Sequence, residues 1–192
     1  MNESVRSVLL VGVGGQGTIM ASDILSAVMI SAGFDAKKSE VHGMAQRGGC
    51  VSSHVRFGRK VYSPLAGKGD VDVLVSFEKL ETLRYLEYLK PDGKIIINNE
   101  EIYPPSVNLG DTAYPSDTID FIKKHFKDVK VVDATAMALR SGDKRMANTV
   151  ILGVLSSYLD IEADIWEDVL KESFPAKILE GNIKAFRLGR GE

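Results

Sequence analysis

Cysteine and histidine are scarce: the chain of 192 residues has one cysteine, Cys50, and three histidines. A lone cysteine forms no internal disulfide, and it falls short of the usual four ligands of an iron–sulfur cluster. The histidines show no HExxH spacing, which excludes a zinc site of that type. We therefore expect no metal site and no cluster held by this chain alone.

Long apolar runs and an excess of one charge sign are also missing. No stretch approaches the roughly 20 apolar residues that span a bilayer, and the run before Gly12 is too short for a secretion signal. Lys and Arg number 24 and Asp and Glu 26, so the formal net charge is −2. The composition predicts a soluble cytoplasmic protein without a nucleic-acid or membrane partner, folded as one domain over residues 1–192.

Short apolar or alternating runs are separated by stretches with helical spacing of apolar residues. The predicted strands cover residues 5–11, 34–41, 50–57, 61–63, 71–77, 94–98 and 129–133. The predicted helices cover residues 16–32, 78–89, 116–126, 134–139, 145–158, 163–173 and 177–186. A turn is predicted at 91–93 and a long loop at 99–115, and Ser116 is expected to cap the next helix.

Strands that alternate with helices predict an α/β protein with a three-layer α/β/α, Rossmann-like, mostly parallel (mixed) sheet and a helical C-terminal part. The link between the strands at 34–41 and 50–57 has only about eight residues, and a parallel crossover needs a dozen or more. We therefore expect strand 50–57 to be antiparallel. Its alternating pattern predicts a half-exposed strand with His54 and Arg56 on a polar surface face.

A glycine-rich motif follows the first predicted strand directly and opens the first predicted helix. Residues 12–17, GVGGQG, fit the pattern GxGxxG, whose small residues allow a ligand to approach the backbone at a helix N-terminus. The alternative is a tight turn that binds nothing. A nicotinamide site also needs an acidic residue about 20 positions on, and Lys37 and Lys38 occupy that region between Asp35 and Glu40. We interpret the two lysines as a solvated face.

A second glycine-rich stretch, GMAQRGG, covers residues 43–49. Its Arg47 is a candidate to bind an anion through bidentate hydrogen bonds from the guanidinium. Taken alone, such a loop is equally well a turn. Cys50 is interpreted as a small buried hydrophobe. Asn148 and Thr149 sit in an otherwise apolar helix, where capping, exposure and ligand contact all remain open. The sequence shows no Ser/His/Asp or Cys/His arrangement, so we predict no catalytic residue in this chain.

The two glycine-rich blocks together resemble one family. GVGGQGTIMASDIL at 12–25 and EVHGMAQRGGCVSSHVRFG at 40–58 resemble the gamma subunit of the 2-oxoacid (pyruvate):ferredoxin oxidoreductases, most closely the small beta subunit of the indolepyruvate enzymes. NTVILGVL at 148–155 is similar to the family as well. The resemblance is strongest over residues 5–60 and weak after about residue 100.

The resemblance implies a division of labour. A larger partner subunit would carry thiamine diphosphate and iron–sulfur clusters, and the complex would convert a 2-oxo acid to an acyl-CoA while reducing ferredoxin. The small subunit would contribute assembly and coenzyme A binding, and would be inactive when isolated. Carried onto this sequence, the binding role falls on Gly12, Gly14, Gly15, Gln16, Gly17, Thr18, Gln46, Arg47, Gly48 and Gly49.

Two other interpretations stay open at this point. The chain could be a free-standing nicotinamide or flavin oxidoreductase, although its length leaves little room for a substrate domain and no general base is visible. It could also be an interaction module whose glycine loops are structural. Titration with NAD, FAD and coenzyme A separates the free-standing oxidoreductase from the other interpretations.

Overall fold

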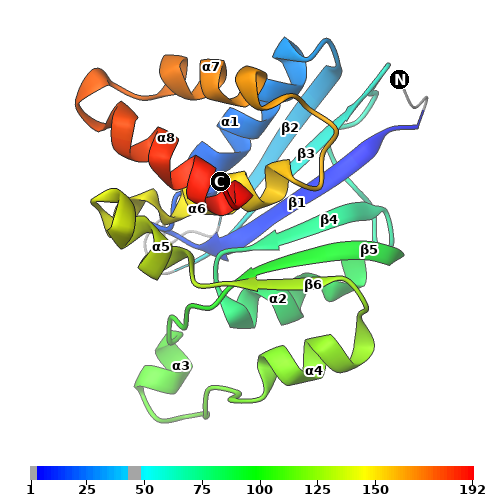
Figure 1. Ribbon diagram of the computed structural model, residues 1–192. Helices are drawn as coiled ribbons and strands as arrows, with labels where there is room; N and C mark the ends of the chain where they lie inside the picture. The colour runs from blue at the N-terminus through cyan, green and yellow to red at the C-terminus, as the bar shows by residue number, and fades with distance from the viewer. Residues whose placement is uncertain (1–3, 43–48) are drawn as a thin grey trace.

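A six-stranded sheet runs through the middle of the molecule in the order β2-β3-β1-β4-β5-β6 (Figure 1). The computed structural model describes residues 4–42 and 49–192. The strands are β1 Arg6–Val13, β2 Asp35–His42, β3 Cys50–Gly58, β4 Val71–Ser76, β5 Leu89–Asn98 and β6 Val129–Val132. β1, β4, β5 and β6 run parallel, and β3 is antiparallel to both of its neighbours, β1 and β2. The predicted mixed sheet with one antiparallel strand is confirmed.

Helices cover both faces of this sheet. The α-helices are α1 Thr18–Ser31, α2 Lys79–Tyr85, α3 Pro105–Asn108, α4 Thr118–His125, α5 Ala134–Ser141, α6 Ala147–Ser156, α7 Ala163–Ser173 and α8 Ala176–Arg190. Short 3₁₀ helices at Leu86–Tyr88 and Lys144–Met146 precede β5 and α6. One face carries α1 and α5 to α8, and the other carries α2 and α4 (Figure 1). The predicted three-layer α/β/α architecture is confirmed.

The central strand β1 explains why its sequence is a continuous apolar run. Val8 and Leu10 pack with the helices of the α1 face, whereas Leu9 and Val11 pack on the α2 face. All four side chains are buried. A parallel strand covered on both sides has no solvent face to mark with polar residues.

The prediction that β3 is half-exposed is wrong. Ser52, Ser53 and His54 are all buried, although their pattern alternates with valines. β3 lies between β1 and β2, and the chain after it folds back over its polar face: the Ala66 N–H donates to Nδ1 of His54 at 3.3 Å. Arg56 donates to the backbone oxygen of Leu65 at 2.9 Å on the same face. The alternating sequence of β3 therefore marks a buried polar layer, not a face exposed to solvent.

The boundary between α2 and β5 also differs from the prediction. The predicted helix 78–89 ends as a 3₁₀ turn at Leu86–Tyr88, and β5 begins at Leu89, where a turn was expected only at 91–93. Leu89 is buried and pairs with Val71 of β4, and the register then shifts before Lys94 pairs with Val73. Pairing with β4, which the periodicity of residues 78–93 does not record, therefore sets this boundary.

Smaller corrections concern helix ends and one strand. Residues 61–63 form no strand, and α3 interrupts the expected loop at 99–115. α4 begins at Thr118 with Asp117 at the N-cap position, so Ser116 is not its cap. α8 is longer than predicted, and α7 matches its predicted bounds. Among the described residues, no helix has the length and apolar character needed to cross a bilayer.

Candidate functional site

The loop between β1 and α1 forms the first candidate site, at the edge of the sheet where the parallel strands end. Gly15 and Gly17 have φ values of 108° and 82°, in the left-handed region that favours glycine. Gly17 is the N-cap of α1, without a side-chain capping bond, and its oxygen accepts the N–H of Ala21 at 2.9 Å. The N–H groups of residues 18–20 therefore precede the first helical hydrogen bond, as an anion site at a helix N-terminus requires.

Gln16 fixes the shape of this loop from inside. Its Oε1 accepts the N–H of Val13 at 2.8 Å, and its Nε2 donates to the backbone oxygen of Phe77 at 2.8 Å. The same Nε2 lies 3.5 Å from Oε2 of Glu100. Gln16 thus ties the loop to the chain after β4 and after β5, a structural role that the GxGxxG pattern does not reveal.

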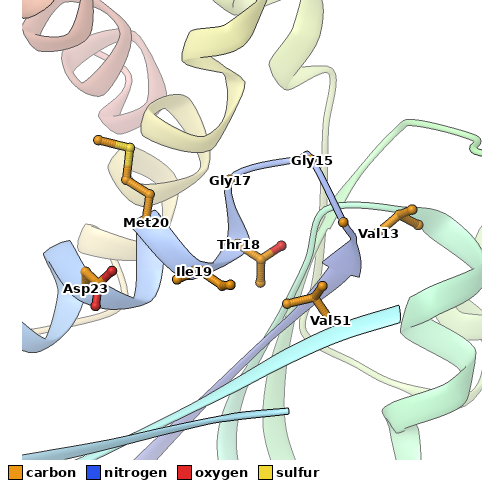
Figure 2. A pocket seen from close by; sticks show the side chains of 9 residues that line it. Val13, Gly15, Gly17, Thr18, Ile19, Met20, Asp23 and Val51 are labelled. Carbon is orange, nitrogen blue, oxygen red and sulfur yellow. The ribbon is translucent and has the colours of Figure 1, made fainter. Parts of the chain in front are cut away.

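Space inside the turn is tight at Gly12. A Cβ at Gly12 would lie 2.8 Å from Oε1 of Gln16 and 2.9 Å from Oγ1 of Thr18. Thr18 is only 3% exposed, and its Oγ1 has no hydrogen-bond partner in the parts of the chain that the structure describes. Figure 2 shows this hydroxyl on the side that faces the bend of the loop. A buried hydroxyl without a partner is costly, which marks this position as one that a ligand or water would complete.

A pocket of about 520 Å³ opens on the loop and the first turn of α1. Its lining combines backbone with apolar side chains: Val13, Gly14, Gly15, Gly17, Thr18, Ile19, Met20, Asp23 and Val51 (Figure 2). Ile19 and Met20 are each more than a third exposed, so the pocket offers apolar surface to a ligand. The pocket can hold a ligand with both a polar and an apolar part.

Asp23, an acidic residue that lines this pocket, forms an ion pair with Lys38 of β2. Lys38 contacts both Asp23 and Glu40. Burial opposes its charge, but the two carboxylates outweigh that effect and raise the pKa of Lys38. The interpretation of Lys37 and Lys38 as a solvated face is therefore wrong for Lys38, which balances an acidic group of the pocket.

The second predicted loop meets the first at its end. The N–H of Gly14 donates to the backbone oxygen of Gly49 at 2.8 Å, so the two glycine-rich blocks are neighbours in space. Gln46, Arg47 and Gly48 lie outside the described residues, and their ligand contacts stay predictions. The same holds for ligand contacts of the first loop, whose geometry is now described.

Asn148, whose role the sequence alone left open, lies beside the glycine loop. It lies in the first turn of α6, is 5% exposed, and faces the glycine loop: a Cβ at Gly17 would stand 2.6 Å from its Nδ2. Capping and ordinary exposure are both excluded, because the N-cap is Met146 and the side chain is buried. Only proximity in space reveals this contact, since nothing in the local sequence links Gly17 to α6.

Cys50 is only partly buried, and a carboxyl group accompanies it. Its Sγ lies 3.4 Å from Oε1 of Glu81, which also contacts Arg84 Nε at 3.1 Å. Burial and the neighbouring Glu81 raise the pKa of the Cys50 thiol, and burial raises the pKa of Glu81. A protonated thiol is a poor nucleophile, so this pair does not resemble an activated cysteine.

Glu78, another buried acid near the sheet edge, has hydrogen-bond partners within the protein. Glu78 accepts the N–H of Glu81 at 2.9 Å, the N–H of Ile102 at 3.2 Å and the hydroxyl of Tyr114 at 2.5 Å. Burial and Glu78 raise the pKa of Tyr114, which keeps this hydroxyl a donor. Within residues 4–42 and 49–192, no three His, Cys, Asp or Glu side chains are grouped to hold a metal ion. The glycine loop, the N-terminus of α1 and the pocket beside them are suited to binding and orienting a ligand.

Comparisons with known proteins match this chain over nearly its whole length. The family model of pyruvate ferredoxin/flavodoxin oxidoreductase matches residues 7–192. The indolepyruvate oxidoreductase subunit IorB of Thermococcus kodakarensis is 36% identical over 95% of this chain and 93% of its own length. The common gamma subunit of the pyruvate/ketoisovalerate oxidoreductases of Pyrococcus abyssi is 28% identical over 92% of this chain and 90% of its length.

Solved structures share the fold. Pyruvate oxidoreductase subunit PORC of Thermotoga maritima has a TM-score of 0.74 at 23% identity, covering 98% of this chain and 96% of that one. A 2-oxoglutarate:ferredoxin oxidoreductase of Magnetococcus marinus, solved with 2-oxoglutarate, coenzyme A and succinyl-CoA bound, has a TM-score of 0.75 at 20% identity. It covers 99% of this chain and 31% of that longer one. The chain belongs to the pyruvate ferredoxin/flavodoxin oxidoreductase family, as a small subunit of a 2-oxoacid:ferredoxin oxidoreductase.

Proposed function

We propose that this chain is the small subunit of a thiamine-diphosphate-dependent indolepyruvate ferredoxin oxidoreductase in the cytoplasm. The observation that carries the proposal is the 36% identity to IorB subunits over 95% of the chain. The assembled enzyme would decarboxylate an aryl pyruvate, transfer the acyl group to coenzyme A and pass the electrons to ferredoxin. This chain would then act through binding and assembly rather than through the redox chemistry.

The division of labour is supported by what the chain can hold. Iron–sulfur clusters usually take four cysteine ligands, and Cys50 is the only cysteine. Thiamine diphosphate and the clusters are therefore assigned to a larger partner subunit. Coenzyme A, as the co-substrate, is assigned to the first loop, where Gly15, Gly17 and the N-terminus of α1 suit a phosphate. The pocket beside Ile19 and Met20 suits the less polar part of the same molecule.

Co-expression with the large subunit tests the proposal. We expect the two chains to purify together and the complex to reduce ferredoxin with indolepyruvate and coenzyme A, whereas the small subunit alone is inactive. Calorimetric titration of the complex with coenzyme A, NAD and FAD is the second measurement. Binding of NAD or FAD without coenzyme A, or activity of the isolated chain, would overturn the proposal.

A further inference from the structure

A line of buried polar side chains runs from α8 through α6 to the glycine loop. At its far end, Asn182 of α8 donates from Nδ2 to the backbone oxygen of Ile178 at 2.9 Å. This bond leaves Oδ1 of Asn182 as the acceptor for the hydroxyl of Thr149, which donates to it at 2.7 Å. The orientation of each group therefore follows from the one before it.

The next step fixes the amide of Asn148. Its Oδ1 accepts the N–H of Thr149 at 2.9 Å, so the oxygen side of the amide faces α6. The NH₂ side then faces Gly17, whose Cβ, if present, would lie 2.6 Å from Nδ2. Asn148 is 5% exposed, and its Nδ2, which carries two N–H donors, lies on the side of the loop.

The surroundings of this amide extend the first pocket. Asn148 lines a second hollow of about 250 Å³, whose walls include Met146, Phe174 and Ile178. Met20 lines both hollows, whereas Gly17 lines the first and Asn148 the second. Nearby, the hydroxyl of Thr18 has no partner among the described residues. Two buried polar groups from different helices therefore flank Gly17.

We propose that Asn148 is a ligand-binding residue, whose Nδ2 donates to a phosphate oxygen of the ligand held at the first loop. The inference rests on the proposed function, because it takes coenzyme A as that ligand. Glycine at position 17 lets the loop approach the amide closely, since a Cβ there would meet Nδ2. The neutral donor adds to the N–H groups at the N-terminus of α1 without adding charge.

The test compares two nearly isosteric variants in the assembled enzyme. Asn148→Asp replaces the NH₂ donor by an oxygen that repels phosphate, and Thr149→Val breaks the same buried line but leaves Nδ2 in place. We expect Asn148→Asp to weaken coenzyme A binding by about tenfold or more. Thr149→Val should lower the melting temperature and keep coenzyme A affinity within about twofold of the wild type. Calorimetry and thermal unfolding give the two readouts.

Pantetheine, which lacks phosphates, serves as the second probe. Its affinity should be the same in the wild type and in Asn148→Asp if the amide contacts phosphate. Equal coenzyme A affinity in the wild type and Asn148→Asp, or an equal loss for both ligands, overturns the inference and leaves the proposed function standing. A wild-type complex that does not bind coenzyme A overturns the proposed function itself, and the inference with it.

Discussion

Gly153 of α6 lies directly against Gly189 of α8. A Cβ at Gly189 would stand 3.1 Å from the Cα of Gly153 and 2.1 Å from the backbone oxygen of Val150. A Cβ at Gly153 would stand 2.1 Å from the oxygen of Phe186. The two helices therefore touch through their backbones, and this contact holds α6, which carries Asn148, in the core.

Gly153→Ala should destabilise the chain, because the methyl group meets backbone rather than a movable side chain. Overpacking of this kind costs about 1–3 kcal/mol, more than the roughly 1 kcal/mol that alanine contributes in a helix. Chemical denaturation measures the change. Gly67→Ala is the control, since a Cβ there meets nothing within 4 Å in residues 4–42 and 49–192. Equal stability of the two variants would refute the tight contact.

Gly17→Ala and Gly15→Ala form a matched pair at the first loop. Both glycines have positive φ, so either change adds roughly 1 kcal/mol of backbone strain. Only the methyl group at Gly17 also meets Asn148, because a Cβ at Gly15 has no atom of the described residues within 4 Å. We expect Gly17→Ala to lower the melting temperature further than Gly15→Ala. A larger effect at Gly15 would contradict this description of the loop.

Gln16→Glu should weaken the anchor of the loop. The new carboxylate would face the backbone oxygen of Phe77 and the carboxylate of Glu100 in place of the Nε2 donor. Leaving such a group without its donor costs about 1–3 kcal/mol. The double variant Gln16→Glu with Glu100→Gln removes the repulsion and should recover part of the loss in a denaturation experiment. Additive effects of the two changes would show that the side chains do not interact.

His54 should make stability depend on pH. Burial, and then the charge of Arg56, lowers the pKa of His54 below its ordinary 6.5. As the pH falls, the unfolded chain therefore binds a proton before the folded one. The free energy of unfolding falls as the pH drops from 6.5 towards the folded-state pKa, and the His54 contribution is constant well above pH 6.5. Thermal unfolding between pH 5 and 8 should show a smaller fall in His54→Gln than in the wild type. The same pH dependence in both proteins would contradict the burial of His54.

Cys50 should react slowly with alkylating agents at neutral pH, because burial and Glu81 raise its pKa. Glu81→Gln removes the carboxylate beside the sulfur and leaves Arg84 near it, so the alkylation rate should increase. Glu87→Gln is the control, since Glu87 pairs with Lys68. Mass spectrometry of iodoacetamide-treated protein follows the rate. A rate that does not change in Glu81→Gln would remove Glu81 as a cause.

The sequence by itself determined the alternation of strands and helices, the antiparallel direction of β3 and the place of the first glycine loop. These features depend on local information. Helical and strand periodicities come from neighbouring residues, and the short link before Cys50 excludes a parallel crossover. The turn at 12–17 is likewise encoded within its own residues, two of which have the positive φ that glycine allows.

Tertiary structure alone decided which of these residues face one another. The alternating sequence of β3 predicts a half-exposed strand, yet His54 is buried because the chain near Ala66 folds over it. Gln16 was predicted from its motif alone, and only the folded chain shows that its amide donates to the backbone oxygen of Phe77. Asn148 comes to Gly17 from a distant helix. Each of these contacts joins segments far apart along the chain, and packing between elements, which no local pattern records, sets them.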